Sequence, residues 1–215
     1  DPSRLSFLVP PLGGRDETMD ERNEVSQTMI QKTVLPNGVR ILSEQVPSVR
    51  SCSIGIWVES GSRHEPEALC GISHFLEHML FKGTETRTAA QLATAFDAIG
   101  GQVNAFTTKE NTCYYTKTLD THIAEATELL CDMFFHSRFG EEETNLERGV
   151  ISEEIGMYED SPEDLVIERL ASAIYDGSPL GRPILGTKER LQPIHGSTLG
   201  EYCRSHYNPA NTLVS

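Results

Sequence analysis

The sequence predicts an α+β fold in which helices pack on a largely antiparallel sheet. Its 215 residues alternate between short strand-like runs, helical stretches, a hairpin, further helices and a final strand-like run. Pro36-Asn37-Gly38 separates two apolar runs, which is typical of a β-hairpin turn. Later apolar residues recur at spacings of three and four, which predicts helices.

The expected strands share alternating apolar residues or flank a turn signal. They are residues 29–35, 39–46, 51–60, 102–107 and 112–119, with a last one beginning at 212. A chain that stops where a strand begins looks like a domain cut short.

The expected helices are marked by apolar spacing and by capping residues. Thr88 with Gln91 forms a capping-box pattern, Asp120 is placed to cap another helix, and Ser161-Pro162 opens a further one. These helices cover about 67–81, 88–100, the stretch after 120, 142–158, 161–175 and 197–206.

The chain divides into two parts by composition. Residues 1–27 are rich in Pro, Gly and charge without periodicity, which favours a flexible N-terminal arm. Residues 28–215 carry the periodic patterns and form one domain.

The net charge and the cysteine content indicate which partners and which cellular compartment to expect for the protein. The net charge of −14 opposes a phosphate backbone, so no nucleic-acid partner is expected. Five cysteines without a CxxC spacing favour a reducing compartment over a disulfide framework. No apolar run approaches the roughly 20 residues of a membrane span, and no signal peptide is visible.

The segment His74-Phe75-Leu76-Glu77-His78 has the spacing of a metal site on a helix. Residues four apart differ by about 40° in azimuth, so both imidazoles project from one face and can converge on zinc. Glu77 lies on the same side, where its carboxylate can reach a water on the metal as a general base.

A third ligand is expected from the acidic helix at 142–158, because a catalytic zinc generally has three protein ligands. Val150 and Ile151 indicate that this helix packs against the core. Geometry leaves Glu147, Glu153 and Glu154 all open as the ligand.

The sequence of residues 74–78 would also fit a surface helix that carries two histidines and a salt-bridging glutamate without a metal. Apolar residues at 69, 72, 76 and 80 instead predict a buried helix, whose inward polar groups require partners.

The HxxEH motif is the inverzincin signature, and the chain resembles the insulinase/pitrilysin family of zinc peptidases beyond it. Within this family it resembles the branch that holds mitochondrial processing peptidase β subunits and their bacterial relatives. The resemblance runs from about residue 30 to the end. Its blocks are LPNGVRIL, SIGIWVESGSRHE, GISHFLEHMLFKGT, GGQVNAFTTKENTCYY, LERGVISEEI and SPLGRPILGT.

The resemblance implies a zinc endopeptidase with one Zn²⁺ per chain. It makes His74 and His78 ligands and Glu77 the base. The family spacing of 76 residues beyond the second histidine selects Glu154 as the third ligand. Glu147 is then a carboxylate that supports the site from outside the ligand set.

The resemblance also implies the substrate and the partner. Asn104, Ala105 and Phe106 match an edge strand on which extended peptides or presequences would bind by β-augmentation. An ordinary hairpin strand without a substrate role would have the same sequence pattern. Family members enclose a chamber with a second homologous half, from the same chain or another subunit. A non-catalytic partner or respiratory-complex core subunit is the alternative function. The bacterial cytoplasm and the mitochondrial matrix both suit the free cysteines.

Overall fold

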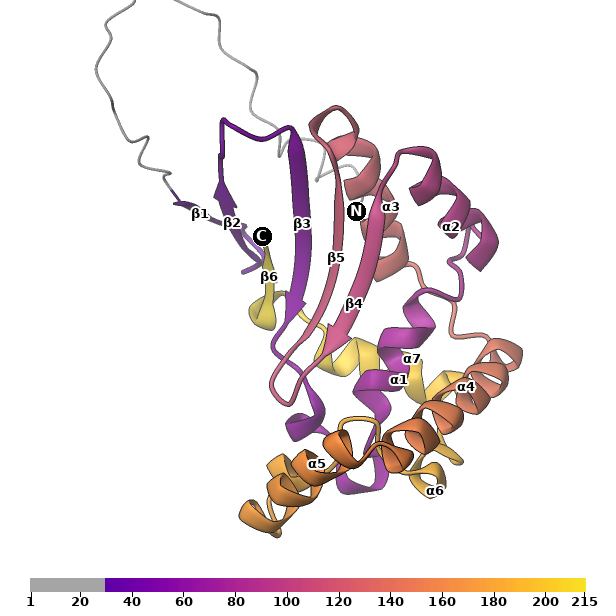
Figure 1. Cartoon of the computed structure of the whole chain (residues 1–215). Helices are drawn as coiled ribbons and strands as arrows, with labels where there is room; N and C mark the ends of the chain where they lie inside the picture. The colour runs from indigo at the N-terminus through magenta and orange to yellow at the C-terminus, as the bar shows by residue number, and fades with distance from the viewer. Residues whose placement is uncertain (1–29) are drawn as a thin grey trace, which may run out of the picture.

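A computed structural model describes residues 30–215. The expected arm at 1–27 lies outside these residues. The described chain forms a six-stranded mixed sheet with helices on one face and at one end (Figure 1).

The sheet has the strand order β1-β2-β6-β3-β5-β4. Every strand pair is antiparallel except β2 with β6, so the expected largely antiparallel sheet is confirmed. The strands are β1 (Ile30–Val34), β2 (Arg40–Glu44), β3 (Ser51–Val58), β4 (Gln102–Thr107), β5 (Thr112–Leu119) and β6 (Thr212–Val214).

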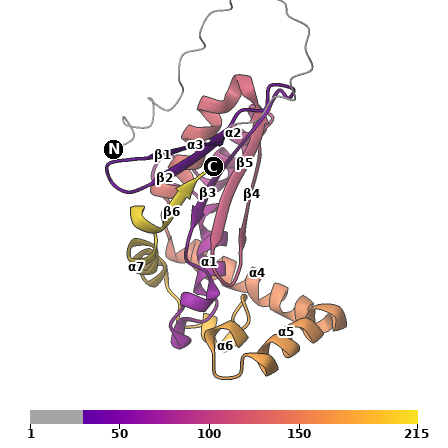
Figure 2. The same ribbon diagram turned by 90° about the vertical axis from the view of Figure 1, so that its left-hand side faces the viewer.

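The helices gather on one face of the sheet and below it, as the turned view shows (Figure 2). Exposure alternates along β4, whose residues are exposed and half-buried in turn, because only one face meets the helices. The helices are α1 (Ile72–Leu80), α2 (Ala89–Ala98), α3 (Ile123–Phe135), α4 (Glu141–Asp160), α5 (Pro162–Ile174), α6 (Lys188–Leu191) and α7 (Gly196–His206). Within residues 30–215, none of the helices has the length and apolar character of a membrane span.

The helix expected at 67–81 is two elements. Glu67–Leu69 forms a 3₁₀ turn, and α1 begins only at Ile72. Gly71 between them has a φ of 96°, a left-handed conformation that favours glycine and interrupts a right-handed helix. A Cβ on Gly71 would also lie 2.6 Å from the carbonyl oxygen of Leu185, so this loop fixes where the helix starts.

Two further expectations about helices were wrong. Asp120 does not cap α3, because residues 120–122 form a 3₁₀ turn before it. The Asp120 carboxylate instead pairs with Arg50 at 2.7 Å. The four-residue helix α6 was not expected, since four residues are too few to show a helical period.

The caps expected for α2 and α5 are confirmed. The Thr88 hydroxyl accepts a hydrogen bond from the Gln91 amide, and the Gln91 side chain accepts one from the Thr88 amide. The Ser161 hydroxyl accepts one from the Asp164 amide, with Pro162 in the first turn.

Helix α1 is held in the centre of the core, in contact with α4, α7 and β4. Phe75 and Leu76 have no exposed surface and anchor the helix on the sides away from its polar residues. On α4, Ile151 is fully buried, but Val150 is 52% exposed. Val150 therefore does not contribute to the packing that the sequence suggested, and Ile151 with Ile155 does.

We expect Leu76→Ala to lower the free energy of unfolding by about 2–5 kcal/mol, because it leaves a cavity under α1. Leu146→Ala is the matched control, since Leu146 is 68% exposed and its truncation should change stability by less than about 0.5 kcal/mol. Urea unfolding of both variants measures the difference. Equal losses would show that α1 is not anchored through Leu76.

Candidate metal centre

Helices α1 and α4 bring together His74, His78 and Glu154. One ligand atom from each residue lies within 4.8 Å of the other two. Oε2 of Glu154 is 3.7 Å from Nε2 of His74 and 3.6 Å from Nε2 of His78. The structure therefore places these three predicted ligands at one point, although 76 residues separate the second histidine from the glutamate.

These separations suit a small ion. Zinc bonds of 2.0–2.1 Å in a tetrahedral arrangement put neighbouring ligand atoms roughly 3.4 Å apart. The observed distances of 3.6 and 3.7 Å from Glu154 to the two histidines are slightly longer than this value and exceed the length of a normal hydrogen bond. Two imidazole nitrogens and one carboxylate oxygen also form the His₂Glu set of known catalytic zinc sites.

His74 is a buried member of this cluster. Its side chain is 10% exposed, and its Nε2 faces Oε2 of Glu154 at 3.7 Å. Within residues 30–215, its Nδ1 has no hydrogen-bond partner. Burial, followed by the charge of His78, lowers the pKa of His74 to about 4. The ring is therefore neutral at pH 7. A lone pair on Nε2, the nitrogen that faces Glu154, would be available to a metal, which would offset part of the cost of burying the ring.

Glu147 orients His78 from the side opposite to Glu154. Its Oε1 lies 2.8 Å from Nδ1 of His78, and its Oε2 lies 2.6 Å from Nζ of Lys82. Burial acts to raise the pKa of Glu147, but the hydrogen bonds from His78 and Lys82 outweigh burial and lower it. An ionised carboxylate only accepts, so Nδ1 of His78 donates to it. In the neutral ring the lone pair then lies on Nε2, the nitrogen that faces Glu154.

Glu153, the remaining candidate on α4, does not join this cluster. It is exposed, whereas Glu154 is half-buried. Consecutive helical residues differ by about 100° in azimuth, so only one of the pair can face α1.

Glu77 lies beside the cluster and outside the set of three. Its Oε2 accepts a hydrogen bond of 2.6 Å from the hydroxyl of Thr107. Burial raises its pKa, which the Thr107 hydrogen bond partly offsets. A half-buried carboxylate next to a candidate metal site is placed to accept a proton.

Asn104, Ala105 and Phe106 lie on β4, which is an edge strand of the sheet. The Asn104 side chain accepts a hydrogen bond of 2.8 Å from the Ala105 amide. The Phe106 ring packs edge-on against Trp57, with 5.6 Å between ring centroids. The expected edge position is observed, and the substrate role of these residues stays a prediction.

Glu65 is a functional neighbour that the sequence reading missed. It is 3% exposed, and its carboxylate accepts hydrogen bonds from the amides of Gly71 (2.7 Å) and Ser73 (2.8 Å). Gly71 has no side chain to cap α1, so Glu65 satisfies the free amides at the start of the metal-bearing helix. Glu65 lies six residues before Gly71, and no capping motif in the sequence has this spacing. The burial that raises the pKa of Glu65 is visible only in the structure.

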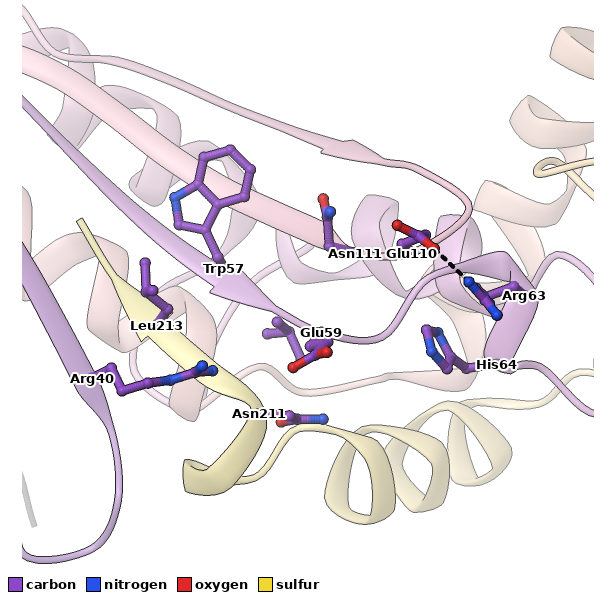
Figure 3. Close-up of a pocket in the computed structure, with 10 residues that line it drawn as sticks. Arg40, Trp57, Glu59, Arg63, His64, Glu110, Asn111, Asn211 and Leu213 are labelled. Atoms are coloured by element: carbon purple, nitrogen blue, oxygen red, sulfur yellow. Dashed lines mark hydrogen bonds and ion pairs between the residues drawn. The ribbon is translucent and has the colours of Figure 1, made fainter. Parts of the chain in front are cut away.

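A cavity of about 580 Å³ lies apart from this cluster, beside the end of β3. Arg40, Trp57 and Glu59 line it, and the Arg63–Glu110 ion pair closes one side (Figure 3). None of the three candidate ligands lines this cavity, so the candidate site rests on the α1–α4 cluster.

Sequence comparison places the chain among peptidases. Residues 40–188 match the insulinase family, peptidase family M16. An uncharacterized zinc protease of Bacillus subtilis, YmxG, is 52% identical over 187 residues, which cover 87% of this chain and 46% of that protein. A probable mitochondrial-processing peptidase subunit beta of Arabidopsis thaliana is 37% identical over 183 residues, which cover 85% of this chain and 34% of that protein.

Solved structures agree with this placement. A protease from Helicobacter pylori superimposes with a TM-score of 0.82 at 25% identity, covering 87% of this chain and 45% of that one. A peptidase M16 inactive domain from Pseudomonas fluorescens gives 0.81 at 15% identity, covering 86% and 45%, which supports the fold alone.

The fold and the sequence therefore define the class as a domain of the insulinase-type peptidases. The chain belongs to the insulinase family, peptidase family M16. It spans about half the length, or less, of the curated relatives it matches.

Replacing Glu65 by Gln should lower the free energy of unfolding by about 1–3 kcal/mol, because one of two charge-assisted hydrogen bonds to buried amides is lost. Glu67→Gln is the control: its carboxylate is 78% exposed and pairs with Arg190 at the surface, where such a pair contributes little. Thermal unfolding compares the two. If both variants unfold like the parent, Glu65 does not cap α1.

Proposed function

We propose that this chain is the zinc-bearing half of a metalloendopeptidase that cleaves extended peptides, with Glu77 as the general base. The observation that carries the proposal is the convergence of Nε2 of the buried His74 and Nε2 of His78 on one carboxylate oxygen of Glu154, which belongs to another helix. Burying these groups together costs stability unless an ion joins them.

His74, His78 and Glu154 would hold the ion, and Glu147 with Lys82 would fix the ring of His78. Bound zinc would supply a Lewis acid that polarises the scissile carbonyl and activates a water. The zinc-protease names of the relatives support this choice of metal, at one ion per chain.

Glu77 would take the proton of the attacking water and pass it to the leaving amine. One of its oxygens is held by Thr107, which leaves the other for this transfer. The raised pKa of Glu77 that burial causes makes the carboxylate a stronger base than an exposed one.

The β4 edge would bind the substrate backbone. Its outer main-chain groups would pair with an added strand once the Asn104 side chain releases the Ala105 amide. Main-chain pairing accepts many sequences, which suits extended peptides or presequences. The edge belongs to the strand that holds Thr107 beside Glu77, so a peptide bound there would lie next to the base.

A second homologous half is the proposed partner, supplied by the same protein or by another subunit. The chain's coverage of 46% of its Bacillus subtilis relative supports this arrangement. The five free thiols support a reducing compartment, with the bacterial cytoplasm and the mitochondrial matrix as candidates.

Glu154→Gln should weaken zinc binding by more than about 100-fold, because even the loss of a partner outside the ligand set costs about 10- to 100-fold. Glu153→Gln, the adjacent and exposed glutamate, should bind zinc like the parent protein. Competition with a chelating dye measures both affinities. Equal affinities would remove Glu154 from the ligand set.

Glu77→Gln should retain zinc and lower kcat/KM for an extended peptide by about 10²- to 10⁴-fold, since the general base is lost while the ligands remain. The assay uses the full-length protein with and without chelator. Zinc-independent cleavage, or a variant as active as the parent, would contradict the mechanism. A zinc-loaded parent that cleaves no peptide would favour the non-catalytic partner-subunit role.

A further inference from the structure

We propose that Thr107 is a positioning residue that holds one oxygen of Glu77 and thereby aims the other at the reacting atoms. This inference rests on the proposed function, because it assigns a role toward the general base. Thr107 closes strand β4, whereas Glu77 lies on α1, so the contact ties the candidate substrate strand to the candidate base.

The direction of the hydrogen bonds follows from the neighbours. The hydroxyl of Thr112 donates to the carbonyl oxygen of Ser60 at 2.9 Å, so its proton is not available to Thr107. The hydroxyls of Thr107 and Thr112 are 3.5 Å apart, whereas that of Thr107 lies 2.6 Å from Oε2 of Glu77. The single proton of Thr107 therefore goes to the carboxylate.

The hydrogen bond from Thr107 reaches one of the two carboxylate oxygens of Glu77. Within residues 30–215, the Thr107 hydroxyl is the hydrogen-bond donor to the Glu77 carboxylate, and it bonds to Oε2 rather than to Oε1. A carboxylate with both oxygens free rotates about its last bond, since that torsion is broad and roughly two-fold. One short hydrogen bond to Oε2 restricts this rotation and thereby fixes the direction of Oε1.

The position of Thr107 on the strand links this effect to the sheet edge. Side chains alternate across a strand, so Thr107 and Ala105 point to the helix-covered face while Phe106 points away. A peptide pairing with the edge at Ala105 would lie two residues from the hydroxyl that orients the base. A shift of β4 would thus be transmitted directly to Glu77.

Thr107→Val removes the hydroxyl and keeps the β-branched shape, while Thr107→Ser keeps the hydroxyl. Thr118→Val is the matched control, because the buried Thr118 lies on the paired strand β5 and its hydroxyl donates to the Ile99 carbonyl oxygen, away from the site. Thr107→Ala serves as a second hydroxyl-free variant if the valine variant does not fold.

The first test is independent of activity. Crystal structures of zinc-free Thr107→Val, Thr107→Ser and Thr118→Val should show a rotated or doubly occupied Glu77 carboxylate only in the valine variant, with His74 and His78 unmoved. A Glu77 carboxylate that keeps the parent orientation without the hydroxyl would overturn the proposal.

The second test is kinetic and uses the full-length zinc-loaded protein. Thr107→Val should lower kcat by roughly 10- to 100-fold, the usual effect of a lost hydrogen bond to a charged group, with KM and bound zinc unchanged. Thr107→Ser should restore kcat to within about threefold of the parent, which a role in folding alone does not predict.

The outcomes separate the two proposals. If the parent cleaves peptides and Thr107→Val has the same kcat, the role of Thr107 is wrong and the proposed function stands. If the zinc-loaded parent is inactive, the proposed function fails, and the crystal structures still decide whether Thr107 fixes Glu77.

Discussion

The contact between α1 and α4 is the constraint on which the candidate site depends. It joins two imidazoles from one helix to a carboxylate from another, inside a core where unpaired polar groups are costly. The fully buried Leu76 and Ile151 hold the helices in register, so apolar packing sets distances that the polar groups alone could not maintain. The stability of the fold and the geometry of the candidate site therefore both depend on the packing of α1 against α4.

Around this contact, the site is supported by groups from three other places in the chain. Glu65 fixes the start of α1, Lys82 holds Glu147, and Thr107 holds Glu77. Each acts on a neighbouring group of the site through one or two short charge-assisted hydrogen bonds. Such bonds are strong and directional, so the three together leave little freedom to the side chains of the cluster.

Much of this arrangement could be predicted from the sequence, because it depends on local periods. The spacing of His74 and His78 on one helix, the hairpin at Asn37-Gly38 and the Thr88 cap are short-range patterns. What could not be predicted depends on tertiary contacts. Asp120 was expected as a cap but pairs with Arg50, and Val150 was expected in the core but faces outward. Geometry alone left three glutamates open on α4, since helical azimuth does not reveal which side meets α1.

The insertion of β6 between β2 and β3 has a consequence for the order of folding. Among the strands of residues 30–215, the β1–β2 hairpin joins the rest of the sheet only through Thr212–Val214. During synthesis, the hairpin therefore remains unattached until some 170 further residues have left the ribosome. Pairing across such a sequence distance is slow, and until it occurs both β2 and β3 expose backbone edges to which a chaperone or a neighbouring chain can bind.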